Sequence, residues 1–169
     1  MKNKNLSFMT QAAMIAAIYV VLTYIFAPFS FGEVQVRISE ALTILPIFTP
    51  AAIPGLFVGC LIGNILGGAI LPDIVFGSIA TLIGAFFTWK LREQKPVVAT
   101  FPPIISNIII VPFVLRYGYG VTLPIPFMML TVGIGEVISC TVLGLIVYGA
   151  LKKYKLSLIH ISEPTRHSL

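Results

Sequence analysis

The sequence predicts an all-α integral membrane protein with six transmembrane helices, and three observations carry this prediction. Apolar residues make up 57% of the chain and charged residues only 10%, whereas a soluble domain has about 25% charged residues. Uncharged stretches long enough to cross a bilayer follow one another along most of the chain. Basic residues gather beside these stretches, as they do at the cytoplasmic ends of membrane helices. We therefore attribute the net charge of +5 to membrane topology and expect no nucleic-acid binding.

The first helix is expected within residues 5–32, which carry no charge. The N-terminus is only weakly basic and no small-residue cleavage site follows, so we expect a retained helix and not a signal peptide. Alanines spaced four apart near its start predict a surface that another helix can approach closely. These alanines are Ala12, Ala13, Ala16 and Ala17. Residues 28–39 then form a polar loop, in which Glu33 and Arg37 have the spacing of a surface salt bridge.

Residues 41–72 carry no charge and are too long for one ordinary membrane helix. Because prolines interrupt their middle, we expect a short helix that ends near Phe48 and a second helix from about Pro54 to Leu71. Glycines spaced four apart give this second helix a smooth surface for a neighbour. The glycine stripe consists of Gly55, Gly59, Gly63 and Gly67.

The last three helices are expected at residues 74–89, 96–115 and 127–151. The basic clusters test this count, since an even number of helices must separate any two clusters that face the cytoplasm. Interpreting residues 41–72 as two helices gives an even number between each pair of clusters. The sequence thus predicts six helices in the plasma membrane of a bacterium, with both termini in the cytoplasm. The clusters are Lys2 and Lys4; Lys90, Arg92 and Lys95; and Lys152, Lys153 and Lys155.

Residues 156–169 are expected not to belong to the native structure. Residues 156–166 read LSLIHISEPTR, which resembles the translation of a transposase adapter used in DNA library preparation. We therefore assign residues 1–155 to a single transmembrane domain and exclude the tail. Both histidines, His160 and His167, lie in the tail. Without them the chain offers little for a proton relay or a metal site, and we expect neither a metal nor a cofactor.

Glu136 is the strongest candidate for a binding residue, because a carboxylate inside a membrane helix is costly and usually faces a cavity or a partner. A structural carboxyl group bonded to a neighbouring helix is the alternative. Asn107 and Asn64 also lie inside predicted helices. Their amides could bind a ligand or simply form hydrogen bonds between helices.

The other charged residues of the predicted outer side are weaker candidates. We expect Arg37 and Glu40 near the outer boundary, in contact with water. Asp73 directly precedes a predicted helix, where an N-cap is the simplest role. With Glu136 included, this side of the protein carries four acids and two arginines, namely Glu33, Glu40, Asp73 and Glu136, and Arg37 and Arg116. This balance favours a cationic or hydrogen-bond-donating ligand over an anion.

One long run of the sequence resembles a known family. Arg37–Thr43 reads RISEALT, Phe48–Gly55 reads FTPAAIPG and Gly59–Asn64 reads GCLIGN, with Pro46 between the first two. This pattern resembles the QueT family of queuosine-precursor transporters, and the resemblance covers Leu6 to about Lys155. It implies the six-helix bundle of the substrate-binding (S) component of an energy-coupling factor (ECF) importer.

The resemblance also implies a substrate and partners. The substrate would be a 7-deazaguanine, such as 7-aminomethyl-7-deazaguanine (preQ1), or queuine. The protein would not be an enzyme, and two cytoplasmic ATPase subunits would supply energy through a transmembrane coupling (T) subunit. This agrees with the absence of a Walker A sequence from the chain. In S-components an A-x-x-x-A motif of the first helix contacts the coupling subunit, and both alanine pairs described above match it.

On this resemblance the candidate residues take roles in recognition. Glu136 would accept hydrogen bonds from the ring N–H and exocyclic NH₂ groups, and Asn107 or Asn64 would donate to the 6-oxo group. Glu40 or Asp73 would pair with the aminomethyl cation. The expected site is thus built from the six residues Arg37, Glu40, Asn64, Asp73, Asn107 and Glu136.

Three alternatives remain open from the sequence. The protein could be an S-component for another vitamin or nucleobase. It could be a self-contained oligomeric pore or carrier, with the glycine stripe as the contact between copies. A membrane-embedded enzyme is the third class, but Glu136 has no histidine or evident nucleophile beside it in the predicted helices.

Overall fold

The computed structural model describes residues 2–30 and 36–154, and these residues are almost entirely helical. Glu33 and the tail of residues 156–169 lie outside the described residues. The first half contains α1 (Lys2–Ile25), α2 (Ala27–Ser30), the 3₁₀-helix η1 (Ile38–Ile47) and α3 (Ala52–Leu66). The second half contains α4 (Leu71–Lys90), α5 (Pro96–Ala99), α6 (Phe101–Phe113), the π-helix η2 (Val114–Gly118), α7 (Ile125–Glu136) and the π-helix η3 (Val137–Leu143).

The all-α membrane fold predicted from the sequence is confirmed. Four helical stretches are long and apolar enough to cross a membrane, and two shorter apolar helices accompany them. The long stretches are Lys4–Ile25, Leu71–Lys90, Pro96–Gly118 and Ile125–Tyr154, and the shorter ones are Ile38–Ile47 and Ala52–Leu66. The chain is therefore a multi-pass membrane protein.

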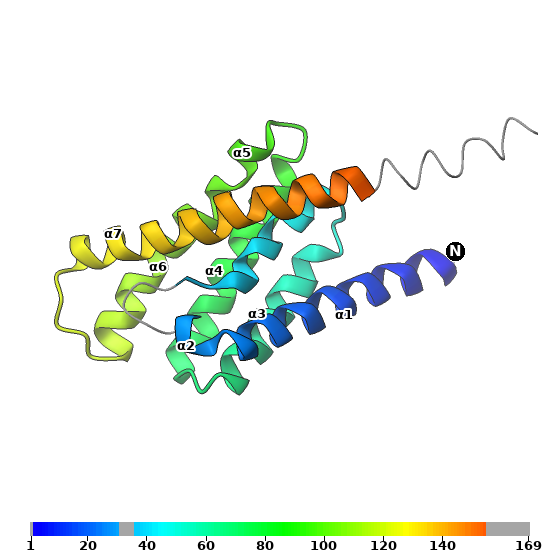
Figure 1. The fold of residues 1–169 in the computed structure, drawn as a ribbon. Helices are drawn as coiled ribbons and strands as arrows, with labels where there is room; N and C mark the ends of the chain where they lie inside the picture. The colour runs from blue at the N-terminus through cyan, green and yellow to red at the C-terminus, as the bar shows by residue number, and fades with distance from the viewer. Residues whose placement is uncertain (1, 31–35, 155–169) are drawn as a thin grey trace, which may run out of the picture.

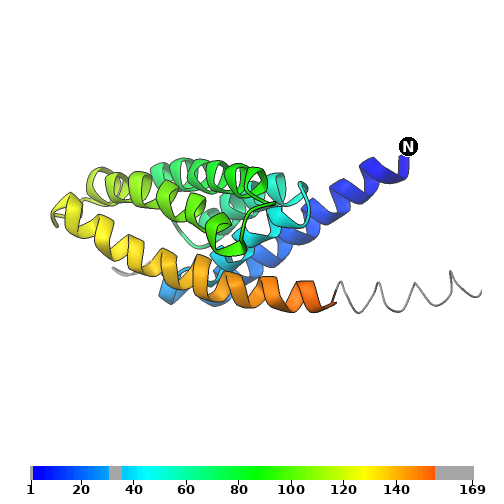
Figure 2. The same ribbon diagram turned by 90° about the horizontal axis from the view of Figure 1, so that it is seen from above.

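The helices form a closed bundle with η1 at its centre (Figure 1). Helix α1 packs on α3, α3 on α4, α4 on α6, and α6 on α7. The 3₁₀-helix η1 contacts α1, α3, α4 and η3, and so it links the first and last helices of the bundle. Figures 1 and 2 show the N-terminus and the end of the C-terminal helix at the same end of the bundle, with the α6–α7 connection at the opposite end.

The central helix η1 is the expected short helix, and it ends at Ile47, close to the predicted Phe48. A 3₁₀-helix has three residues per turn, so Arg37, Glu40 and Thr43 line up along one side of it. The Thr43 hydroxyl donates to the Glu40 carbonyl oxygen at 2.6 Å. Every residue from Ser39 to Ile44 is buried. This long 3₁₀ segment therefore carries a line of polar side chains through the middle of the bundle.

The neighbour of the glycine stripe is α1 of the same chain. A Cβ atom added at Gly59 would lie 2.8 Å from the Tyr19 Cβ atom, and one added at Gly63 would lie 3.2 Å from the Thr23 Cβ atom. Only glycine permits so close an approach of two helices. Helix α1 covers Gly55, Gly59 and Gly63 inside the monomer, so an oligomeric pore would need a different surface between copies.

The four alanines of α1 do not form one surface. Ala16 is 7% exposed and lies beside Gly59, and Ala12 approaches Gly55. Ala13 and Ala17, in contrast, are exposed on the outside of the bundle. A shift of one residue along α1 thus separates the alanines that pack on α3, Ala12 and Ala16, from the alanines on the outside of the bundle, Ala13 and Ala17.

Candidate functional site

All six predicted site residues lie in one buried polar cluster at the centre of the bundle. Their exposed fractions range from 0% for Glu40 to 4% for Arg37. The prediction that Arg37 and Glu40 contact water at the outer boundary is therefore wrong, because η1 carries both side chains into the bundle. The cluster draws residues from η1 and its preceding residue (Glu40, Arg37), α3 (Asn64), α4 (Asp73), α6 (Asn107) and α7 (Glu136).

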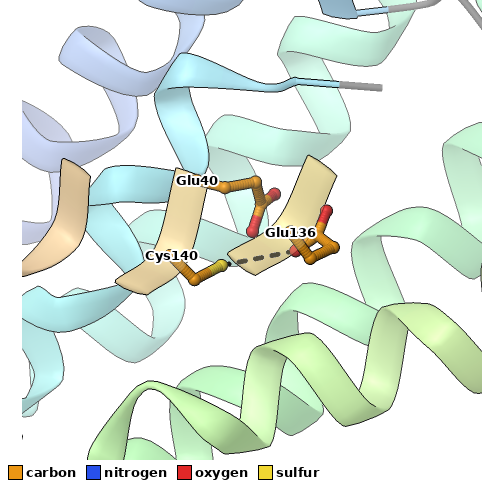
Figure 3. A group of neighbouring side chains, drawn as sticks. All are labelled: Glu40, Glu136 and Cys140. Atoms are coloured by element: carbon orange, nitrogen blue, oxygen red, sulfur yellow. Dashed lines mark hydrogen bonds between the residues drawn. The ribbon is translucent and has the colours of Figure 1, made fainter. Parts of the chain in front are cut away.

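The inner part of the cluster is formed by Glu40 and Glu136, which we call the acid pair. Their carboxylates and the Cys140 thiol offer ligand atoms that all lie within 4.8 Å of one another. Figure 3 shows the three side chains converging on a common space from η1 and from the C-terminal helix. Like charges so close together and away from water repel each other strongly. The arrangement therefore requires a proton or a cationic ligand for compensation.

Neutral donors hold each carboxylate of the acid pair by one oxygen. The Tyr19 hydroxyl donates to Glu40 Oε1 at 2.5 Å. The Asn107 amide donates to Glu136 Oε2 at 2.9 Å, and the Cys140 thiol donates to the same oxygen at 3.3 Å. Glu40 Oε2 is buried and has no hydrogen-bond partner within the described residues. One carboxylate oxygen is thus fixed in position but left without a donor.

Local helix geometry explains how Cys140 reaches the acid pair. Glu136 ends α7, and the chain continues as the π-helix η3, which packs against η1. Wider π-helical turns often occur at functional sites. The Thr43 hydroxyl of η1 lies 3.6 Å from the Cys140 sulfur atom. Both cysteines of the chain are free and buried.

The outer part of the cluster is formed by Arg37 and Asp73, which we call the outer charge pair. Arg37 Nη2 lies 3.7 Å from Asp73 Oδ1. Burial alone would lower the pKa of Arg37, but nearby acidic groups, Asp73 first among them, raise it above its ordinary value. Arg37 therefore stays charged at any physiological pH.

Tyr119 closes the outer charge pair from the α6–α7 connection. Its hydroxyl donates to Asp73 Oδ2 at 2.7 Å. Burial, with a further contribution from the hydrogen bond to Asp73, raises the pKa of Tyr119 to about 12. The hydroxyl therefore keeps its proton, and this hydrogen bond persists, at neutral pH.

Asp73 does not cap α4, so the N-cap expectation is wrong. Ile70 occupies the N-cap position and Asp73 lies inside the first turn of the helix. A carboxylate there still faces the positive end of the helix dipole. Asn64 lies beside it, with its Nδ2 atom 3.5 Å from the Asp73 carbonyl oxygen and 3.6 Å from the Cys60 sulfur atom. Both contacts are long, which leaves the Asn64 amide only weakly engaged.

The buried charges do not balance. Among the described residues, three acids and one base are buried in the bundle, namely Glu40, Asp73, Glu136 and Arg37. An unpaired buried carboxylate is costly, and proteins seldom retain one without a partner or a task. The site as a whole is therefore suited to a cation.

Sequence reasoning missed the contacts that three residues make with the acids. Tyr19 continues the spacing of Ala12 and Ala16 on the side of α1 that faces α3, and this periodicity could have placed it inside the bundle. Cys140 follows Glu136 by four residues, which puts both on one side of a helix. Tyr119 lies in a connection, and nothing in its sequence context indicates contact with Asp73.

The fold and the cluster together define a multi-pass membrane protein with a buried, acidic polar cluster at its centre. Residues 9–153 match the QueT transporter family. The chain therefore belongs to the QueT transporter family, a family of transporters and not of enzymes, as the resemblance implied.

One curated relative is the queuosine precursor transporter QueT of Lactococcus lactis subsp. cremoris (strain MG1363). It is 33% identical over 84 residues, which are 48% of this chain and 48% of the relative. The match thus spans about half the length of each protein. No solved structure matches the chain.

Proposed function

We propose that this protein is the S-component of an ECF importer and that it binds a queuosine precursor of the 7-deazaguanine class in the buried cluster. Membership of the QueT transporter family and the name of the curated relative support the substrate class. The observation that carries the proposal is the excess of buried acids over bases in the described residues. Such a site suits a ligand that is rich in donors and carries a positive charge.

The chemistry of a 7-deazaguanine fits this site. The ring offers N–H and NH₂ donors and one 6-oxo acceptor, and an aminomethyl substituent is cationic at neutral pH. Asn64 is the better placed of the two amides to donate to the 6-oxo group, because Asn107 already donates to Glu136 at 2.9 Å. A site of buried polar groups rejects analogues that leave those groups unpaired.

Ligand binding by the purified chain in detergent tests the substrate, with calorimetry as the measurement. The ligands are 7-aminomethyl-7-deazaguanine, 7-cyano-7-deazaguanine, queuine, guanine, riboflavin and thiamine. We expect tight binding of at least one deazaguanine and no binding of the two vitamins. Tight binding of a vitamin would preserve the S-component assignment and overturn the substrate. A folded protein that binds none of these ligands would contradict the proposal as a whole.

Coupling to a transporter module is the second part of the proposal. Ala13 and Ala17 present small residues four apart on the exposed side of α1, which is a surface suited to close contact with another membrane helix. We assign this surface to the transmembrane coupling subunit, which in turn binds two cytoplasmic ATPases. Ala12 and Ala16 already contact α3. The positive-inside pattern supports our proposal that both termini lie in the cytoplasm, and we propose the plasma membrane of a bacterium as the location.

A bulky residue in the docking surface tests this part. We expect Ala13→Trp to reduce co-purification with the coupling subunit by about tenfold or more, since loss of close helix packing weakens association. Ligand binding should be unchanged, because the alanine does not face the cluster. Ile18→Trp is the matched control, since Ile18 is 47% exposed and lies about 140° around the helix from Ala13. Equal recovery of the complex with both variants would remove the docking assignment.

A further inference from the structure

The spacing of the acid pair limits what can lie between its two members. Ligand atoms of Glu40 and Glu136 lie within 4.8 Å of each other. A charge-assisted N–H···O hydrogen bond is about 2.8 Å long, so one nitrogen can bond two oxygens that are up to about 5.6 Å apart. A single nitrogen with several donors therefore fits between the two carboxylates.

The hydrogen bonds within the cluster leave oxygens of the pair available to a ligand. Tyr19 occupies Glu40 Oε1, and Glu40 Oε2, on a side chain that is 0% exposed, has no partner among the described residues. Asn107 and Cys140 both donate to Glu136 Oε2, and neither donates to its other oxygen. Figure 3 shows the two carboxylates directed toward each other. The protein thus orients both acids and leaves acceptors between them.

Charge distinguishes the nitrogens that this space could hold. An uncharged exocyclic amine would satisfy hydrogen bonds but leave both carboxylates uncompensated in a buried site. An ammonium group offers three donors and one positive charge, and it therefore compensates the pair. Arg37 is already held 3.7 Å from Asp73. The acid pair is the part of the cluster that an added cation would stabilise most.

We propose that Glu40 and Glu136 act together as a clamp for a single ammonium group, the cationic 7-substituent of the substrate. This inference rests on the proposed function and revises the division of roles expected from the sequence, in which Glu136 contacts the ring and only Glu40 or Asp73 contacts the cation. The ring edge is then left to the amide and hydroxyl groups around the pair. Glu40 and Glu136 become the residues that distinguish an aminomethyl group from a neutral substituent.

Selectivity of the unaltered protein is the first test. Calorimetry compares 7-aminomethyl-7-deazaguanine with 7-cyano-7-deazaguanine and guanine, which share the ring amine but carry no cation. We expect the aminomethyl compound to bind about tenfold or more tightly than either neutral compound, as for loss of a charge-assisted contact. Equal affinity for all three would overturn the clamp while leaving the substrate class in place. If none of the three compounds binds, the result would instead contradict the proposed function.

Two variants then separate the clamp from a ring contact. We expect Glu40→Gln and Glu136→Gln each to weaken binding of the aminomethyl compound by about tenfold or more. Each should change binding of the two neutral compounds by less than about threefold, which also shows that the variants fold. If Glu136→Gln weakens binding of all three compounds equally, Glu136 contacts the ring and the clamp is wrong. Glu93→Gln, in the exposed α4–α5 connection, controls for loss of charge alone.

A chelator tests whether a metal ion, and not an ammonium group, occupies the acid pair. The three side chains Glu40, Glu136 and Cys140 could also hold a metal ion. We expect binding of the aminomethyl compound to be unchanged after dialysis against EDTA. Loss of binding with EDTA and recovery with Zn²⁺ would show that the pair holds a metal, and would overturn the clamp.

Discussion

The acid pair and the outer charge pair lie in one buried cluster but differ in how the chain treats their charge. Asp73 has a cation, Arg37, at 3.7 Å and a tyrosine hydroxyl at 2.7 Å. Glu40 and Glu136 receive hydrogen bonds from a phenol, an amide and a thiol, which carry no charge. The outer pair has its own cation and can serve as structure. The acid pair is oriented by neutral donors alone, which suits a binding site for a cation.

Removal of the charge of Glu136 should have the largest effect on binding. We expect Glu136→Gln to weaken binding of 7-aminomethyl-7-deazaguanine by about tenfold or more, because hydrogen bonds to a charged group contribute about 1.5–3 kcal/mol. Calorimetry measures the change, and Glu93→Gln should bind like the unaltered protein. Unchanged affinity in Glu136→Gln would remove this residue from the site and with it the contrast between the two pairs.

Disruption of the contact between α1 and α3 should have the next largest effect on binding, because this contact brings Tyr19 to Glu40. A Cβ atom at Gly59 would lie 2.8 Å from Tyr19 Cβ and 3.1 Å from the Ala16 backbone. We expect Gly59→Leu to lower stability by about 1–3 kcal/mol, as for other overpacked contacts, and to weaken ligand binding. Thermal unfolding in detergent measures the stability. Gly149→Leu is the control, since nothing lies within 4 Å of a Cβ atom at that glycine. Equal melting temperatures of the Gly59→Leu and Gly149→Leu variants would contradict close packing of α1 on α3.

The hydroxyl of Tyr119 should have the smallest effect, because it supports only the outer charge pair. We expect Tyr119→Phe to weaken binding of the aminomethyl compound by about threefold or less, since a single partly exposed hydrogen bond contributes little. A loss as large as that of Glu136→Gln would mean that the outer pair also contacts the ligand.

The pH dependence of the Tyr119 variant sharpens this point. In the unaltered protein the pKa of Tyr119 is raised to about 12. The stabilising contribution of its neutral hydroxyl is therefore fully present below the ordinary tyrosine pKa of about 10. That contribution is lost only as the pH rises through about 12. Binding profiles of the unaltered protein and of Tyr119→Phe between about pH 6 and pH 9 should therefore be parallel. Profiles that diverge within this range would show that Tyr119 titrates there.

The sequence predicted the fold class and named the six residues that the fold brings together in the polar cluster, but it did not predict their surroundings. Glu136, Asn107 and Asn64 were identifiable because polar side chains inside apolar helices are costly and therefore informative. Arg37 and Glu40 were misplaced at the water boundary because they follow a polar loop. Their burial depends on η1 entering the bundle as a 3₁₀-helix, a path that packing against five other elements selects.

The partners of the acids show a second limit of sequence reasoning. Tyr19 and Cys140 are ordinary residues of membrane helices, and only the approach of α1 and η3 to η1 gives them a role. Asp73 looked like an N-cap because its neighbours predict a helix start within a residue or two of it, and helix boundaries are uncertain by that amount. In the structure the helix begins earlier, at Leu71, and the carboxylate turns to Arg37 instead.

The most direct test of the account is a structure of the full chain in a lipid environment with 7-aminomethyl-7-deazaguanine bound. The account predicts the ligand inside the bundle, with its aminomethyl nitrogen within about 3 Å of carboxylate oxygens of both Glu40 and Glu136. The outer charge pair of Arg37 and Asp73 should remain intact beside it. A ligand whose aminomethyl nitrogen contacts Asp73 instead, or one that lies outside the bundle, would contradict the central claim.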